Sequence, residues 1–162
     1  MKRFALPVFV LVSLVMTGCV NLSSNSAPLY QTAEVKQFSQ AAGLGLSPEF
    51  VTCFNDSLHE NLQTARLAEQ MVAEGSKQRN INAANSVIIE GKITAFGQPG
   101  AFLVGGVATE VKVYRMSDHA LLYTLTPRVP YNRSPRNTDA VIAKQTGGKT
   151  AFAIKRALAK PD

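Results

Sequence analysis

The residue types that most often bind metals or attack substrates are scarce, with two cysteines and two histidines among 162 residues. A metal site needs several such side chains converging on one point. Cys53 and His59 are six residues apart on a predicted helix, so their side chains do not share a face. His119 falls in a predicted turn. We therefore expect neither a metal site nor a cysteine–histidine nucleophile.

Motifs for acid–base chemistry and phosphate binding are also missing from the sequence. Glu90 and Glu110 fall on neighbouring predicted strands, but each alternates with lysine, as is typical of a solvated sheet face. The glycines between residues 97 and 106 match neither G-x-x-x-x-G-K-[ST] nor G-x-G-x-x-G, and no G-x-S-x-G motif occurs. We therefore predict that the protein is not an enzyme and has no catalytic residues and no cofactor.

Cys19 indicates chemistry of a different kind, the attachment of lipid. Lys2 and Arg3 precede an apolar stretch over residues 4–16, which is too short to span a bilayer and typical of a signal peptide. The sequence Met-Thr-Gly before Cys19 resembles a bacterial lipobox. The alternatives are an ordinary secretory cleavage and a plain membrane anchor. We predict a lipoprotein signal peptide over residues 1–18 and a lipidated cysteine.

Lipidation of Cys19 would hold the mature protein firmly to a membrane. A diacylglycerol and an N-acyl chain (palmitate) together exceed the two acyl chains that stable anchoring needs. Because Val20, rather than Asp, follows the cysteine, we expect the outer membrane, with the domain facing the periplasm and no nucleic acid as partner. Residues 19–28 read as the lipidated cysteine and a flexible tether. Cys53 is then left as a buried small residue, a reactive thiol or an intermolecular bridge.

Two segments are candidates for contacts with other molecules. Arg128, Arg133 and Arg136, with Tyr131 among them, form a predicted basic loop that suits phosphate or carboxylate groups of an anionic envelope polymer; a solvated loop is the alternative. Phe102, Leu103 and Val104 lie between glycines and read as an exposed contact patch for a protein partner or as the start of a buried strand.

The elements that would position these residues follow from hydrophobic periodicity. Ser47-Pro48-Glu49 predicts a helix start, and apolar residues at three- and four-residue steps continue to Ala65. Residues 87–96, 107–116 and 121–126 read as strands, the last two joined by a turn at 117–119. Weaker strands are expected over 29–38 and 67–73.

The C-terminal part is expected to be a helix after an irregular segment. Past Pro127 the chain reads as an irregular loop, and a helix should run from residue 138 or 139 to about 160. Its apolar points are Val141, Ile142, Phe152, Ile154 and Leu158. Gly147-Gly148 either divides it into two helices or lets its backbone approach the sheet closely.

One domain accommodates these elements. Removal of 18 residues leaves 144 of the 162, with a formal charge of +4 instead of +6, and hydrophobic residues make up 46% of the chain, which excludes a fully disordered protein. We predict a two-layer α+β domain over residues 29–162, with a mostly antiparallel sheet and two main helices packed on one face.

The strand VIIEGKITAFG, the segment GQPGAFLVGGVA and the strand EVKVYRMSDHALLY resemble a group of small bacterial outer-membrane lipoproteins. Their periplasmic domain occurs in the curli-secretion-channel lipoprotein, the penicillin-binding-protein-activator lipoprotein and an exopolysaccharide-export lipoprotein. The chain is most similar to an uncharacterised family of this kind. The resemblance implies a non-enzymatic role in envelope assembly or export, through a protein partner or self-association; binding of peptidoglycan or lipopolysaccharide is the alternative.

Overall fold

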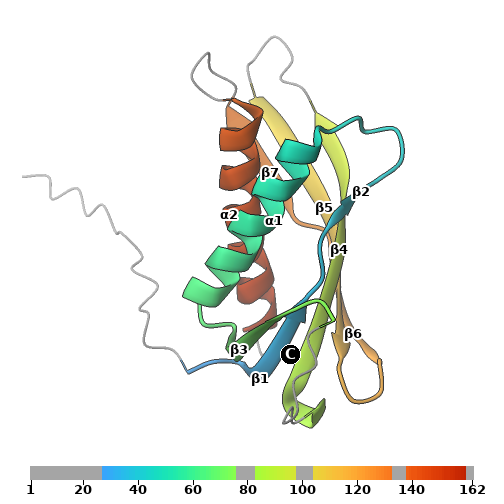
Figure 1. Ribbon diagram of the computed structural model, residues 1–162, viewed down its shortest axis with the longest axis vertical. Helices are drawn as coiled ribbons and strands as arrows, with labels where there is room; N and C mark the ends of the chain where they lie inside the picture. The colour runs from blue at the N-terminus through green and yellow to red at the C-terminus, as the bar shows by residue number, and fades with distance from the viewer. Residues whose placement is uncertain (1–26, 76–82, 98–103, 133–137, 160–162) are drawn as a thin grey trace, which may run out of the picture.

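The computed structural model describes residues 27–75, 83–97, 104–132 and 138–159. They form a seven-stranded mixed sheet with two long helices on one face (Figure 1). The α+β class and the placement of both helices on one face are confirmed. The elements are β1 (Tyr30–Val35), β2 (Ser39–Gln40), α1 (Pro48–Thr64), β3 (Ala68–Ala73), the 3₁₀ turn η1 (Ala83–Asn85), β4 (Ser86–Gly97), β5 (Val104–Arg115), β6 (Leu121–Leu125), β7 (Arg128–Asn132) and α2 (Asp139–Leu158).

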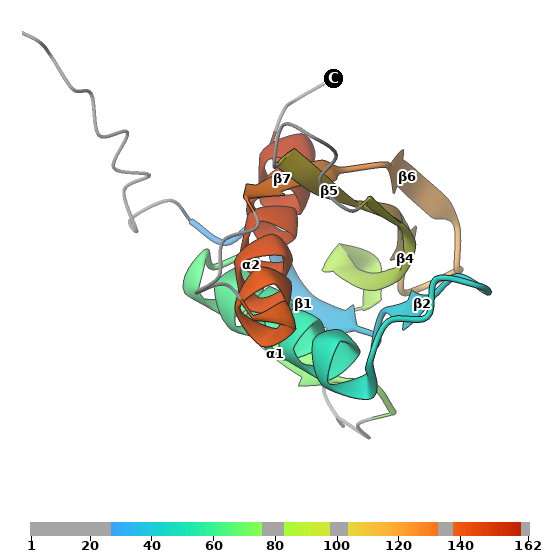
Figure 2. The same ribbon diagram turned by 90° about the horizontal axis from the view of Figure 1, so that it is seen from above.

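The sheet has the strand order β3-β1-β4-β5-β6, with β2 also beside β4 and β7 also beside β5. The pairings β1–β3, β1–β4 and β2–β4 are parallel, and β4–β5, β5–β6 and β5–β7 are antiparallel. Register shifts interrupt β4 at Ile93/Ala95 and β5 at Val113/Tyr114. Such bulges increase local twist, and the sheet curls strongly when seen from above (Figure 2).

α1 begins where the sequence predicts. The Ser47 hydroxyl accepts a hydrogen bond from the Phe50 amide at 3.1 Å, and Pro48 occupies the first turn. The hydroxyl accepts from an amide that has no carbonyl partner within the helix, and the proline has no amide hydrogen that would need one. The buried face of the helix then packs on the sheet and on α2 through Phe50, Phe54, Ser57, Leu58 and Leu62.

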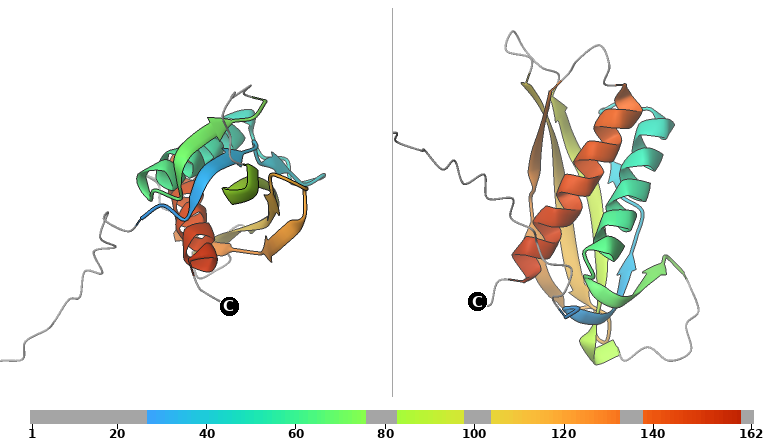
Figure 3. Two further views of the ribbon diagram at one scale, coloured as in Figure 1. Left: turned by 90° about the horizontal axis from the view of Figure 1, so that it is seen from below. Right: turned by 90° about the vertical axis from the view of Figure 1, so that its left-hand side faces the viewer.

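α2 is a single helix that runs through Gly147-Gly148 without a break. A Cβ at Gly147 would lie 2.4 Å from the Phe54 carbonyl oxygen, so the glycine allows close contact with α1. The expectation of a close approach to the sheet is therefore wrong. The Ser57 hydroxyl donates to the Lys144 carbonyl at 2.7 Å, and Lys155 donates to the carbonyl of Ala65 just past the end of α1. The helices therefore run parallel, side by side (Figure 3).

The alternation of β5 separates the core from the outer face of the sheet. Val107, Thr109, Val111 and Val113 are buried toward the helices, whereas Lys112 points the other way. Large buried side chains between the layers come from both helices, from β4 and from the link between β1 and β2, among them Phe38, Phe54, Ile89, Ile93, Ile142 and Ile154. A single hydrophobic core therefore joins β1 to α2.

The segment after Pro127 is a strand rather than the irregular loop that its prolines predict. Arg128–Asn132 pairs with the first half of β5, with Asn132 opposite Val104 and Pro130 opposite Gly106. Pro130 is tolerated because β7 pairs with β5 alone among the described strands. Val104 therefore belongs to β5 and not to a loop.

Candidate functional site

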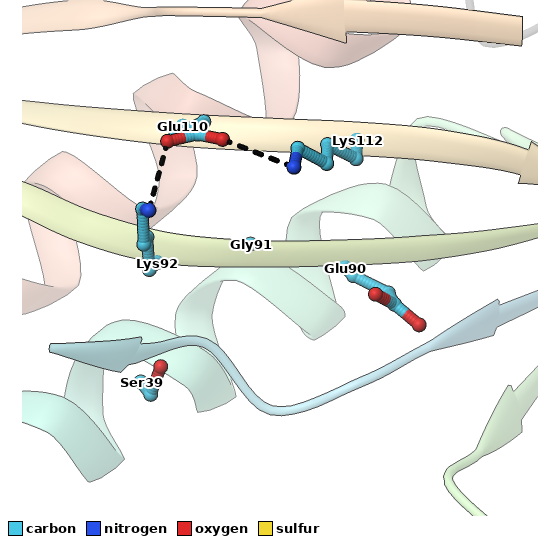
Figure 4. A pocket seen from close by; sticks show the side chains of 6 residues that line it. All are labelled: Ser39, Glu90, Gly91, Lys92, Glu110 and Lys112. Carbon is cyan, nitrogen blue, oxygen red and sulfur yellow. Dashed lines mark ion pairs between the residues drawn. The ribbon is translucent and has the colours of Figure 1, made fainter. Parts of the chain in front are cut away.

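The outer face of the sheet carries a row of opposite charges across β4 and β5. The register places Glu90 opposite Lys112 and Lys92 opposite Glu110. Glu110 binds the ammonium groups of Lys92 at 3.0 Å and Lys112 at 3.4 Å (Figure 4). Glu90 pairs with Lys36.

The two lysines beside Glu110 favour the charged form of its carboxylate. The hydrogen bond from Lys92, assisted by Lys112, lowers the pKa of Glu110 below its ordinary value. The hydrogen bond to Glu90 raises the pKa of Lys36. A catalytic acid needs a pKa near the working pH, so this arrangement does not suit proton transfer. The predicted solvated sheet face is confirmed.

A shallow hollow of about 200 Å³ lies over this row and is lined by Ser39, Glu90, Gly91, Lys92, Glu110 and Lys112. Ligand pockets usually measure roughly 300–1,000 Å³, and this one lies on the open side of the sheet (Figure 4). The paired charges leave the hollow with little capacity to bind a small molecule specifically.

The histidines and Cys53 lie apart from one another. His119 adopts a positive φ of 58° in the β5–β6 turn, with its ring 5.4 Å from that of Tyr114. Cys53 forms no disulfide and is half-buried on α1 against the core, six positions before His59. Within the described ranges, no three His, Cys, Asp or Glu side chains are grouped to hold a metal ion.

The structure divides the residues of the predicted anionic-ligand site. Arg128 is exposed at the start of β7. Tyr131 is only 3% exposed; its ring stacks on Phe96 and its hydroxyl donates to the Gly97 carbonyl at 2.9 Å. The tyrosine therefore belongs to the core, because strand pairing with β5 turns it inward. Arg133 and Arg136 lie outside the described residues.

Most of the other predicted contact residues also lie outside the described residues. This applies to Cys19, Phe102 and Leu103, whereas Val104 is the first residue of β5. Their proposed roles therefore stay predictions.

The structure reveals an exposed pair among the apolar residues of α2 that the sequence analysis names together. Val141 is 37% and Phe152 is 47% exposed, whereas Ile142, Ile154 and Leu158 are buried. The two residues are 11 positions apart, close to three full helical turns, so they share one side. The small residues Ala143, Gly147 and Ala151 face inward instead. The 11-residue spacing is the signal that separates this pair from the buried positions.

None of the helices in the described ranges is long and apolar enough to cross a membrane. Neither a family model nor a curated protein matches the chain.

Solved structures share the fold of this chain. A Xanthomonas campestris protein of the DUF330 family matches with a TM-score of 0.57 and 13% identity, over 81% of this chain and 85% of that one. PelC from Paraburkholderia phytofirmans, a dodecamer, matches at 0.53 and 14%, over 80% and 92%. A neuraminyllactose-binding hemagglutinin homologue from Helicobacter pylori matches at 0.52 and 8%, over 83% and 86%. The resemblance to the curli-secretion-channel and penicillin-binding-protein-activator lipoproteins stays a prediction.

Proposed function

We propose that this chain is a non-enzymatic lipoprotein, anchored to the outer membrane through Cys19, that acts in envelope biogenesis or export through protein–protein contacts. The observation that carries the proposal is the exposed pair Val141 and Phe152 on the outer side of α2, 37% and 47% exposed. Aromatic residues are enriched where proteins meet. The helix presents them on a rigid element, as a docking surface requires.

Two further observations support this proposal. The signal peptide and lipobox predict a lipid at Cys19, which would confine the domain to a membrane surface. PelC, which shares the fold at a TM-score of 0.53, is a dodecamer. A fold of this kind can therefore serve as an assembly unit.

Site-specific photo-crosslinking in living cells tests the protein-contact part. A photoreactive phenylalanine analogue at position 152 is compared with the same analogue at Thr124, which is exposed on β6. We expect discrete crosslinked products from position 152 and none from position 124. Equal patterns from both positions, or no product from either, would contradict the proposed contact role.

Metabolic labelling with a fatty-acid analogue tests the anchor. We expect label in the native chain and none in Cys19→Ser, which should also leave the outer-membrane fraction. Retention of both label and membrane association in the variant would contradict lipidation at Cys19.

The alternative function is binding of peptidoglycan or lipopolysaccharide through Arg128, Arg133 and Arg136, and the exposure of Arg128 supports it. Co-sedimentation with each polymer should fall with salt and disappear when all three arginines become alanine. Tyr131→Phe is the matched control, because a buried tyrosine should not contribute to binding. Unchanged binding by the triple variant would exclude this segment as the site.

A further inference from the structure

The two helices carry opposite charges on the sides that face away from the sheet. All charged residues of α1 are acidic, namely Glu49, Asp56 and Glu60, and all three are exposed. They recur at steps of seven and four residues, so they form one stripe along the helix.

The exposed side of α2 is basic and partly apolar. After Asp139 in the first turn, its exposed residues are Val141, Lys144, Gln145, Lys149, Phe152 and Arg156. Lys144 lies at the edge of this exposed side that is nearest α1, where its backbone carbonyl accepts a hydrogen bond from the Ser57 hydroxyl. We call the acidic stripe of α1 and these residues of α2 together the outer helix face.

The charges of the outer helix face have no ion-pair partner within the part of the chain that the structure describes. The ion pairs there join other residues, on the sheet face and in the β5–β6 turn. Lys149 donates only a long hydrogen bond, 3.4 Å, to the Pro130 carbonyl. The acidic and basic stripes are therefore both available to an outside partner.

We propose that the outer helix face binds a second copy of this chain, with α1 of each copy against α2 of the other. The proposal rests on the contact role argued above and names the partner of that surface. A two-fold axis parallel to the helices places α1 of each copy opposite α2 of the other. The acidic stripe of α1 then faces basic residues of α2 at two equivalent contacts. Such an interface uses the same surface on both copies.

The register of the two helices makes the charges meet. Ser57 of α1 lies level with Lys144 of α2, an offset of 87 residues, and Asn61 lies beside Gly148 with the same offset. Rotation about an axis parallel to the helices leaves these levels unchanged. Asp56 would therefore face Lys144 of the second copy within about one residue, or about 1.5 Å of rise.

Other residues of the outer helix face meet in the same arrangement. Glu60 would face Lys149 of the second copy within about two residues, or about 3 Å of rise. Val141 comes within about one residue of the level of the half-buried Cys53, or about 1.5 Å of rise, and Phe152 comes level with the C-terminal end of α1. The apolar and the charged residues therefore both find complements.

The size of the outer helix face suits a modest interface. A helix of 17 residues is about 25 Å long, and two adjacent helices are about 20 Å wide, which gives a footprint of about 500 Å² per copy. The sum for two copies is about 1,000 Å², which is typical of weak or transient complexes. Dimerisation should therefore depend on concentration and be strengthened when both copies are held to one membrane.

The position of the N-terminal end agrees with such anchoring. Leu29 donates a backbone hydrogen bond to Leu67 at 3.0 Å, close to where α1 ends (Figure 1). A two-fold axis parallel to the helices leaves this end pointing the same way in both copies. Two copies bound to one bilayer could therefore form the dimer without inverting.

A charge-swap experiment on the full chain in detergent tests the proposal by sedimentation velocity. One variant carries Lys144→Glu and Lys149→Glu, and the other carries Asp56→Lys and Glu60→Lys. Each variant alone would place like charges opposite each other, so we expect at least tenfold weaker dimerisation. An equimolar mixture pairs acid with base at both contacts and should restore a dimer.

Controls separate this pairing from general effects of charge and folding. Glu69→Lys with Glu74→Lys makes the same charge change at exposed positions away from the outer helix face and should dimerise like the native chain. Circular dichroism confirms that each variant is folded. A native chain that stays monomeric, a dimer unaffected by either charge reversal, or a mixture that fails to dimerise overturns the proposal.

Photo-crosslinking from position 152 distinguishes the failure of this inference from the failure of the proposed function. Crosslinks to another protein, without self-crosslinks and without a dimer in solution, would overturn the second copy as partner and leave the contact role standing. Absence of every crosslinked product would overturn both.

Discussion

Replacing Gly147 by alanine should push α1 and α2 apart. The added Cβ would lie 2.4 Å from the Phe54 carbonyl oxygen and 3.2 Å from the Leu58 amide nitrogen. Both are backbone atoms in the middle of a helix, so no side-chain rotation relieves the contact. One helix must move by about 1 Å to regain an ordinary van der Waals distance.

The cost of this movement should exceed the gain in helix propensity. Alanine is favoured over glycine inside a helix by about 1 kcal/mol. Overpacking of a close-packed contact costs roughly 1–3 kcal/mol, and separation weakens the 2.7 Å hydrogen bond from Ser57 to Lys144, worth about 1 kcal/mol. We therefore expect Gly147→Ala to lower the free energy of unfolding by about 2 kcal/mol.

Gly148→Ala is a matched control one residue further along the same helix. A Cβ there would lie nearest to the Asn61 side chain, at 3.1 Å from Nδ2, and that side chain can shift by a few tenths of an ångström. The propensity gain of about 1 kcal/mol should then dominate. This variant should be as stable as the native chain or slightly more stable.

Urea unfolding followed by circular dichroism measures both variants, and thermal unfolding provides a second measurement. At about 4 °C per kcal/mol for a domain of this size, the midpoint of Gly147→Ala should fall by about 8 °C. If Gly147→Ala were as stable as Gly148→Ala, the close packing of the helix backbones at this position would be refuted.

Three further changes probe the sheet and its two faces. Gly91→Ala would place a Cβ 2.3 Å from the Phe38 ring and should cost about 1–3 kcal/mol in urea unfolding; if Phe38→Leu does not reduce that cost, the clash is not its cause. Tyr131→Phe removes the 2.9 Å hydrogen bond to the Gly97 carbonyl and should lower the unfolding free energy by about 1 kcal/mol, whereas an unchanged midpoint would argue against that bond. Because its lysine partners lower the pKa of folded Glu110, their stabilisation is present above the ordinary glutamate pKa of about 4.3 and is lost as pH falls below it. Urea midpoints measured from pH 6 to pH 3 should therefore fall more steeply for the native chain than for Glu110→Gln, and parallel curves would contradict the ion pairs.

Local signals predicted the elements that local interactions form. Ser47-Pro48 indicated the start of α1 because an N-cap and a first-turn proline act within one helical turn. The alternation around Val111 indicated which side of β5 faces the core, because side chains of a strand alternate whatever its partners are. The charged sheet face followed from the same alternation.

Non-local contacts decide the features that sequence reasoning missed. β7 contains Pro130 and forms only because β5 supplies partner residues 20 to 28 positions earlier. Phe152 and Val141 are as hydrophobic as the buried Ile154, but α1 approaches α2 at Gly147 and so selects which side of the helix is buried. The outer helix face was missed for a similar reason, since its opposite charges become neighbours only when α1 and α2 pack.

The parallel pairing of β1 with β4 determines how far the domain reaches from its anchor. Thr32 pairs with Ser86 at the start of β4, so the N-terminal end lies at the opposite end of that strand from Gly97. A 12-residue strand spans about 40 Å. With Cys19 as the anchor, a ten-residue leash adds at most about 35 Å. The C-terminal ends of β4 and β7 would then reach up to about 75 Å from the membrane surface, while the turn between β5 and β6 would stay nearest the lipid. Shortening the ten-residue leash would reduce that maximum distance without altering the fold.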